Sequence, residues 1–182
     1  MSTSEQQKEI ATIKERTITV KLSDADCARL MDKCGACGLT AGELIENFIG
    51  DLVCGTYSNG SDEREYANRW FDRCGFSMFP EKTLLNYFLW YGMDPEDYLN
   101  VLEDIEDAKK RLEYIKQHPE LPHYENDIEA NTEEIDACEE AMKNMTEDWK
   151  PEGEPDMEEE ISRIKKWVEE KEQLLKGKEV PE

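Results

Sequence analysis

Residues 16–53 read RTITVKLSDADCARLMDKCGACGLTAGELIENFIGDLV, and their apolar pattern predicts a strand followed by two helices. Apolar and polar side chains alternate over residues 17–22, which is the two-residue period of a half-buried strand. Ser23 follows as a helix N-cap, with Asp26 three residues later as in a short capping box. The helix predicted after Ser23 has an apolar face, made of Ala28, Leu30, Met31 and Cys34.

The first predicted helix ends at Gly38, since glycine readily adopts the left-handed conformation that closes many helices. Thr40 and Glu43 then form a second capping box, which predicts the start of another helix. This second helix also has an apolar face, made of Leu44, Ile45, Phe48, Ile49 and Leu52. The strand, the turn and both caps agree with one another, as expected for a genuine folding unit.

This order of elements resembles the ribbon-helix-helix family of DNA-binding proteins over roughly a fifth of the chain. The resemblance is carried by the TITVKL segment at 17–22, the turn at Gly38 and Leu39, and the cap at Thr40. It implies that two chains pair their strands into an antiparallel ribbon, so we expect a homodimer. It also implies DNA contacts by outward ribbon residues and by the start of the second helix, namely Thr17, Thr19, Lys21 and Thr40.

The chain is strongly acidic: its 182 residues include 44 Asp and Glu against 22 Lys and Arg, a formal charge of −22. Proteins that bind DNA through a basic surface have the opposite sign of charge. No apolar run is long enough to span a membrane, and the N-terminal residues lack the apolar core of a secretory signal. We therefore expect a cytoplasmic protein, with its six cysteines reduced.

Nearly all the excess charge lies in residues 94–160, which hold 25 acidic and six basic side chains. From Asp94 onward, apolar residues recur at steps of three and four, the pattern of a coiled-coil seam. Proline-containing breakers at 118–122 and 150–155 divide this pattern into three predicted helices. We expect these helices to form an acidic region of coiled-coil type, either as an antiparallel three-helix arrangement or as an elongated hairpin with one further helix.

The predicted fold class is mainly α, with a short N-terminal strand in the ribbon-helix-helix-like unit. The expected parts are a flexible arm at 1–14, the ribbon-helix-helix-like unit at 15–54, an aromatic-rich helical segment at 55–93 and the acidic three-helix region at 94–178. Nine of the sixteen aromatic residues fall between Tyr66 and Tyr91, and Ser61 is predicted to cap the helix that precedes most of them. This third segment is either a small core that packs on the first unit or an exposed platform for a partner.

Residue types needed for catalysis are scarce and poorly placed. The two histidines, His118 and His123, share one linker, so neither is paired with a nucleophile elsewhere. Cys34 and Cys37 have the spacing of half a zinc site, but no second pair of this spacing supplies the other ligands. We therefore expect no enzyme activity, no catalytic residue, no metal and no cofactor, and we interpret the cysteine pair as buried thiols.

Two roles fit the acidic helices. They are either the solvated face of a coiled coil, which keeps the protein soluble, or a surface that imitates the phosphates of a nucleic acid. The second role needs a dense set of carboxylates that competes for the basic groove of a nucleic-acid enzyme. The candidate partner-binding residues are Glu103, Asp104, Glu106, Asp107, Glu133, Glu134, Asp136, Glu139, Glu140, Glu158, Glu159 and Glu160.

The chain as a whole is similar in size and character to anti-CRISPR proteins, the inhibitors of type II, guide-RNA-dependent DNA nucleases. This resemblance implies a DNA mimic from a mobile element that binds the effector nuclease with its guide RNA. It would then block target DNA from the positively charged channel. The alternative is a ribbon-helix-helix transcriptional regulator that binds an operator as a dimer. The two functions are compatible, because an inhibitor on a mobile element can also repress its own gene.

Overall fold

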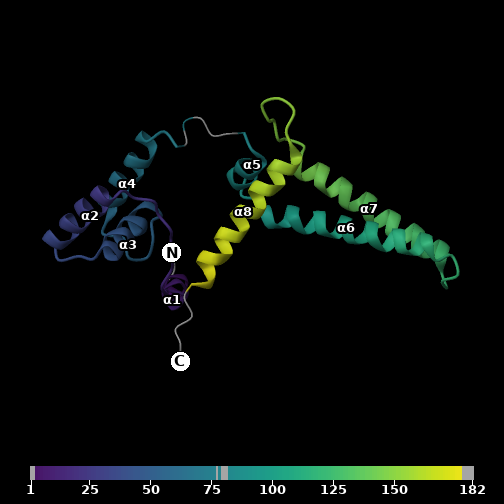
Figure 1. Ribbon diagram of the computed structural model, residues 1–182, viewed down its shortest axis with the longest axis horizontal. Coiled ribbons are helices and arrows are strands. Elements are labelled where there is room, and N and C mark those ends of the chain that lie inside the picture. Colours follow the sequence, from purple (N-terminus) through teal and green to yellow (C-terminus); the bar gives the residue numbers. More distant parts are fainter. Residues whose placement is uncertain (1–2, 77, 79–81, 178–182) are drawn as a thin grey trace. The chain divides into compact units, whose positions relative to one another are not determined.

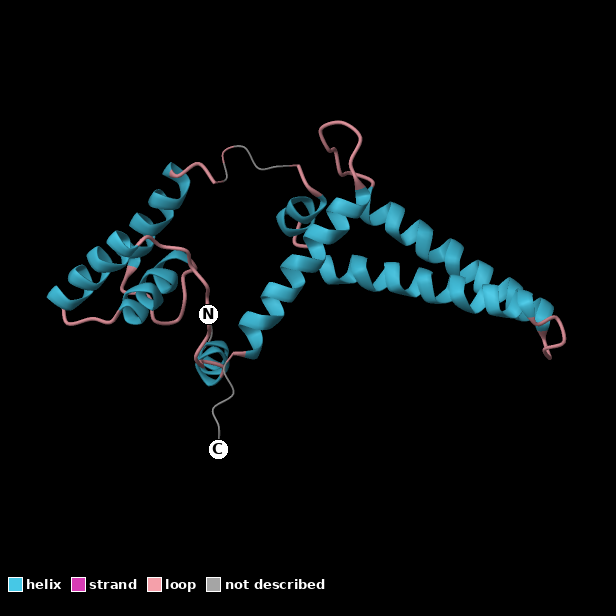
Figure 2. Cartoon of the chain, viewed as in Figure 1, coloured by secondary structure: helices cyan, strands magenta, loops and turns pink. Residues whose placement is uncertain are grey.

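The computed structural model describes residues 3–76, 78 and 82–177. Within those residues the chain forms eight helices and no strand. Figures 1 and 2 show how the loops connect these helices. The helices are α1 (Thr3–Ala11), α2 (Asp24–Ala36), α3 (Ala41–Leu52), α4 (Ser61–Arg73), α5 (Leu84–Trp90), α6 (Pro95–Gln117), α7 (Tyr124–Thr146) and α8 (Met157–Lys176). The expectation of a mainly α protein is confirmed.

The predicted N-terminal strand is wrong, and with it the ribbon of the expected fold class. Residues 13–23 connect α1 to α2 without regular secondary structure, and all their side chains are exposed. A strand needs a neighbour that pairs with its N–H and C=O groups. The described part of the chain provides no such neighbour here, so the two-residue period marks an irregular connection.

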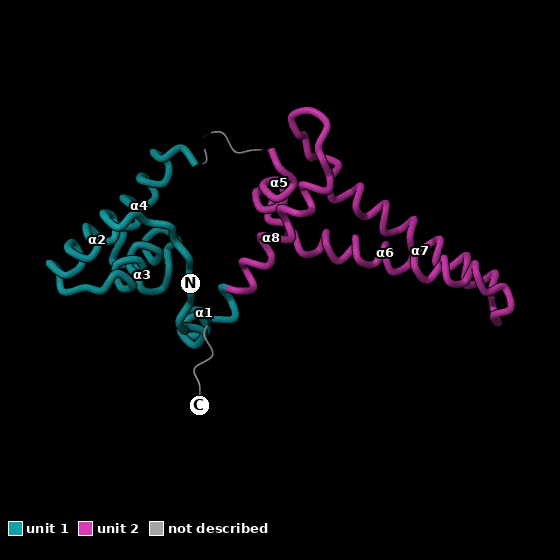
Figure 3. The backbone as a smooth tube through the Cα atoms, in the orientation of Figure 1, with its two compact units in different colours: residues 1–80, 174–182 teal, residues 81–173 magenta. Residues whose placement is uncertain are grey.

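The chain divides into two compact units, which Figure 3 colours separately. Unit 1 comprises residues 1–80 and 174–182, and unit 2 comprises residues 81–173. The aromatic-rich segment at 55–93 is shared between them, because α4 belongs to unit 1 and α5 to unit 2. It is therefore not a single aromatic core; Phe79 and Pro80 of this segment lie outside the described residues.

Helix α2 begins and ends at the predicted caps. The Asp26 N–H donates to Ser23 Oγ at 3.1 Å, which satisfies a free donor in the first turn. At the other end Gly38 has a φ of +70°, and the Leu39 N–H donates to the Cys34 carbonyl oxygen at 2.9 Å. This is the wide hydrogen bond of a Schellman motif, so the predicted glycine cap is confirmed.

Helix α3 begins at the predicted capping box, whereas the predicted cap of α4 is wrong. The Thr40 N–H donates to Glu43 Oε2 at 2.7 Å, and the Glu43 N–H donates to Thr40 Oγ1 at 3.1 Å. In α4, Ser61 is the first helical residue and Gly60 occupies the N-cap position without a side-chain hydrogen bond. The Ser61 hydroxyl lies one position too late in the chain to cap this helix.

Unit 1 leaves most of its apolar side chains uncovered. Its described residues that are buried are Cys34, Asp51 and Ala67. On α3, the apolar residues Ile45, Phe48 and Ile49 stay exposed, although α4 packs on this helix through Trp70. The Phe48 and Trp70 rings meet edge to face with their centroids 5.3 Å apart. The apolar faces predicted for α2 and α3 therefore exist, but unit 1 alone does not bury them.

Unit 2 is built around a long hairpin of α6 and α7 (Figure 1). Each of these helices has 23 residues, which gives a length of about 34 Å. Asp94 caps α6 and Pro95 is its first residue, where the missing N–H of proline has no helical partner to lose. The two helices meet along a seam whose buried members are Ile105, Ala108, Ile115 and Ile135. These apolar residues therefore lie between α6 and α7.

The core of unit 2 lies at the open end of the hairpin, where α5 and α8 join it. Leu84 and Phe88 of α5 pack with Tyr98 of α6 and Ile164 of α8, and all four are almost fully buried. Trp149 packs against this core, and its Nε1–H donates to the Lys82 carbonyl oxygen at 2.9 Å. Helix α8 thus packs across the base of the hairpin (Figure 2).

Candidate functional site: an acidic helical surface

The outer side of α7 carries four carboxylates that we call the outer stripe: Glu129, Glu133, Asp136 and Glu140. Successive members are three or four residues apart, so they share one face of the helix. The seam residues Ile135 and Met142 lie on the opposite face. All four carboxylates are exposed, and none forms an ion pair within the described chain. Glu129 is not among the residues predicted from the sequence. It could have been predicted, because it lies four residues before Glu133 and therefore on the same face of the helix.

Two other predicted carboxylates of α7 are paired with α6. Lys109 Nζ lies 3.0 Å from Glu139 Oε1, and Arg111 Nη2 lies 2.7 Å from Glu134 Oε2. Arg111 Nε also donates to Asn131 Oδ1 at 3.1 Å. The hydrogen bond from Arg111 to Glu134 raises the pKa of the guanidinium above its usual range. Glu134 and Glu139 therefore link the two helices, and their negative charges are partly neutralised within the hairpin itself.

On α6, the predicted carboxylates divide into three that are unpaired and one that is paired. Glu103, Asp104 and Glu106 are exposed and form no ion pair within the described residues. Asp107 Oδ1 lies 2.9 Å from Lys110 Nζ, one helical turn further on. The Lys110 hydrogen bond lowers the pKa of the Asp107 carboxyl, so this residue is ionised and largely neutralised by its neighbour.

The three glutamates that open α8 have three different environments. Glu158 is exposed, whereas Glu159 pairs with Arg163 at 2.7 Å. Glu160 is only 9% exposed, and its Oε2 accepts the Leu84 N–H at 2.6 Å. The assignment of Glu160 to an acidic surface is therefore wrong, because its carboxylate satisfies the first turn of α5 inside the core.

The predicted DNA-contacting residues lie in unit 1, in two different settings. Thr17, Thr19 and Lys21 are exposed along the irregular segment before α2. Thr40 caps α3, where the Glu43 carboxylate accepts its N–H. Hydrogen bonds from the Thr40 N–H and then the Thr40 hydroxyl lower the pKa of Glu43, so it is ionised at neutral pH. A negative charge already occupies the end of α3 at which a DNA phosphate was expected to bind, and it would repel that phosphate.

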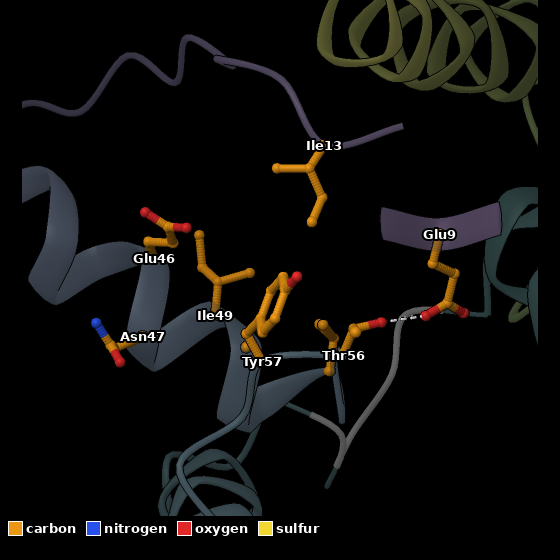
Figure 4. Close-up of a pocket in the computed structure, with 10 residues that line it drawn as sticks. Glu9, Ile13, Glu46, Asn47, Ile49, Thr56 and Tyr57 are labelled. Atoms are coloured by element: carbon orange, nitrogen blue, oxygen red, sulfur yellow. Dashed lines mark hydrogen bonds between the residues drawn. The ribbon is translucent and has the colours of Figure 1, made fainter. Parts of the chain in front are cut away.

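Unit 1 also has a groove that the sequence did not indicate (Figure 4). It has a volume of about 310 Å³ and runs between α1, α3 and the loop after α3. Ile13 and Ile49 reach into it from opposite sides, beside the Tyr57 ring. The loop is held by Asp51, whose carboxylate accepts the Asn59 N–H at 2.7 Å. The spacing of residues along the chain does not predict this groove, because the residues that line it come from segments that are distant in the sequence.

The described residues contain no group of three or more His, Cys, Asp or Glu side chains arranged to hold a metal ion. Of the cysteine pair, Cys34 is buried but Cys37 is exposed, so the interpretation of both as buried thiols is wrong for Cys37. No helix in the described part of the chain has the length and apolar character needed to cross a membrane.

Comparison of the chain with protein-family models, with curated proteins and with solved structures gives no match. The candidate site therefore depends on the residues and geometry described above. It consists of the outer stripe together with the unpaired carboxylates Glu103, Asp104 and Glu106 of α6.

Proposed function

We propose that this protein is an anti-CRISPR inhibitor of a type II, guide-RNA-dependent DNA nuclease. It acts without catalysis in the bacterial cytoplasm, by binding the guide-loaded effector and keeping target DNA out of the positively charged channel. The observation that carries this proposal is the outer stripe, a row of unpaired carboxylates fixed on a packed hairpin.

The electrostatics of α7 favour a basic partner. The helix has eight carboxylates and one lysine over about 34 Å. A DNA duplex has one charge per roughly 1.7 Å, so α7 is less densely charged than DNA. Its carboxylates are, however, mounted on a packed hairpin, so little conformational entropy is lost when they meet Lys and Arg side chains. Steering between opposite charges also accelerates such an encounter.

A charge-reversal variant tests this proposal. We expect E133K/D136K/E140K to lose most inhibition of target cleavage across a panel of guide-loaded type II nucleases. The matched control is E154K/E169K/E170K, which makes the same change in net charge at exposed positions outside the hairpin. Helical content by circular dichroism shows whether both variants are folded. A folded stripe variant that inhibits as well as the wild type contradicts the mimic mechanism.

A second candidate, a transcriptional regulator, is favoured by the exposure of Thr17, Thr19 and Lys21. It predicts that the protein shifts DNA from upstream of its own gene at low salt and that T19A/K21A abolishes the shift. The charge of Glu43 at the start of α3 disfavours this candidate, and the absence of any shift by the wild-type protein would eliminate it.

We also propose a homodimer, formed through the uncovered apolar faces of α2 and α3. Burying these faces against a second copy removes apolar area from water, which is the main driving force for association. Sedimentation of the full chain at micromolar concentration tests this directly. A mass near twice the 21.2 kDa of one chain is expected, and a strict monomer contradicts the proposed dimer.

A further inference from the structure

Helix α5 presents an unusual set of exposed aromatic side chains at its C-terminal end. Trp90 is 83% exposed, Tyr91 66% and the neighbouring Leu89 45%. A tryptophan side chain gains much from burial, so one that stands this far into water is a candidate anchor for a partner. Trp90 and Tyr87 are three residues apart and therefore adjacent on the helix surface.

The helix that carries this aromatic end is firmly held in unit 2. Leu84 and Phe88 are fully buried in the core, and the Leu84 N–H donates to the buried Glu160 carboxylate. At the other end, the Met93 N–H donates to the Phe88 carbonyl oxygen at 2.9 Å after Gly92, whose φ is +70°. The exposed rings are thus displayed on a fixed support, which lowers the entropic cost of binding.

The surroundings of these rings are acidic. Tyr87 and Tyr91 have their ring centroids 5.1 Å apart. Met145 and Trp149 pack against the same core cluster as Tyr87, so Glu147 and Asp148, which lie between them in the chain, are brought beside α5. Burial and then the charge of Asp148 raise the pKa of the Tyr87 hydroxyl, in keeping with this position. Asp148 and Glu147 are themselves exposed and form no ion pair within the described residues. Aromatic faces next to free carboxylates suit a planar cation.

We propose that Trp90 and Tyr91, with the carboxylates of Glu147 and Asp148, bind an arginine side chain of the partner protein. A guanidinium stacks on an aromatic ring while its N–H groups reach carboxylate oxygens, a combination that lysine matches poorly. Nucleic-acid bases would also stack on these rings, but their phosphates would be repelled by the two carboxylates. The same repulsion disfavours an anionic lipid surface.

This site deepens the proposed function, and it depends on that function only for the identity of the protein that carries the arginine. Its test therefore uses the full chain and two capped five-residue peptides, one of alternating glycine and arginine and one of alternating glycine and lysine. The affinity of each variant is measured at physiological salt by isothermal titration calorimetry. The site is located through the indole N–H signals of the four tryptophans in NMR spectra of the wild type, with W90F to assign the Trp90 signal.

We expect the arginine peptide to shift the Trp90 signal and to bind more tightly than the lysine peptide. W90A should weaken its binding by roughly three- to thirty-fold, and E147Q/D148N should also weaken it. The control Y114A, which removes an exposed ring on α6, should bind like the wild type. Retention of binding by W90F shows that the aromatic face, and not a change in folding, is responsible.

Equal binding of both peptides, or arginine binding that W90A leaves unchanged, would overturn the site. So would a lower sedimentation mass for W90A than for the wild type, because the rings would then belong to an interface between two copies. Failure of nuclease inhibition is measured separately with the stripe variant. A positive peptide result with no inhibition would reject the nuclease as partner while retaining the arginine site.

Discussion

Glu160 is an acidic residue that serves the core of unit 2. Its carboxylate accepts the Leu84 N–H at 2.6 Å, and Arg163 Nε lies 3.8 Å from its other oxygen. The first-turn N–H groups of a helix have no partner within the helix itself, so a buried acceptor from another element stabilises α5. The acceptor and the donor are 76 residues apart in the chain.

Replacing Glu160 by alanine should therefore destabilise the protein. Because the Leu84 N–H would remain buried without an acceptor, we expect a loss of about 1–3 kcal/mol in the free energy of unfolding. Urea denaturation followed by circular dichroism measures it. The control is Glu158→Ala on the same turn of α8, which should cost less than about 0.5 kcal/mol since this side chain is exposed. Equal losses in the two variants would contradict the capping role of Glu160.

Glu43 gives a pH-dependent signature at the start of α3. Hydrogen bonds from the Thr40 N–H and hydroxyl lower the pKa of its carboxyl in the folded state. The resulting stabilisation is fully present above the pKa of an unfolded-state glutamate, and it is lost as the pH falls through the lower folded-state pKa. NMR titration should give a Glu43 pKa below the usual range. Thr40→Ala should raise that pKa part of the way back, whereas Thr40→Ser should not; no change in Thr40→Ala would reject the assigned cause.

At the scale of elements, the α6–α7 hairpin combines a buried seam with ion pairs along its edge. Ile105 and Ile135 are nearly excluded from solvent. The Arg111 and Glu134 side chains, by contrast, remain 49% and 46% exposed. Water screens a pair this exposed, and ordering two long side chains opposes its formation. The seam should therefore contribute more to the stability of the hairpin than its ion pairs do.

Two variants compare these contributions. Ile135→Ala should lower the free energy of unfolding by about 2–5 kcal/mol, through lost apolar burial and the cavity that remains. Arg111→Ala should cost less than about 1 kcal/mol, because the pair that it breaks is half exposed. Thermal or urea unfolding of the full chain measures both. A larger loss for Arg111→Ala than for Ile135→Ala would contradict this account of the hairpin.

The sequence predicted those elements whose signals are local. The caps at Ser23, Gly38 and Thr40 each depend on residues within one helical turn, and the structure has all three. The conformation of residues 17–22 could not be predicted in this way. Alternation of polar and apolar residues occurs both in paired strands and in exposed irregular segments, so it wrongly predicted a strand here. Pairing depends on a neighbour that the local sequence does not reveal.

The acidic site was predicted in part. The charge pattern located it on the correct helices, since carboxylates are concentrated in residues 94–160. It could not separate Glu133, which stays unpaired, from Glu134, which binds Arg111 across the hairpin. That distinction depends on which residues of α6 face α7. The sequence alone does not show whether the aromatic residues of α5 form a core or an exposed platform. That depends on which of them are buried together with Leu84 and Phe88.

Across the whole molecule, the two units differ in their charge and in how much of their apolar surface they bury. Unit 2 carries most of the negative charge, whereas the described residues of unit 1 bury few of their apolar side chains. This separation is the reason for assigning nuclease binding to the hairpin and self-association to α2 and α3. Variants on the outer stripe should therefore change inhibition while leaving the sedimentation mass unchanged.

Displacement of target DNA tests the central claim most directly. A labelled target duplex is bound to a guide-loaded type II nuclease, and wild-type protein, E133K/D136K/E140K or the control E154K/E169K/E170K is added. We predict that wild type and control remove the nuclease–DNA band and leave free DNA unshifted, while the stripe variant leaves the band intact. Persistence of the band with the wild-type protein across the nuclease panel, or its removal by the folded stripe variant, would contradict the account.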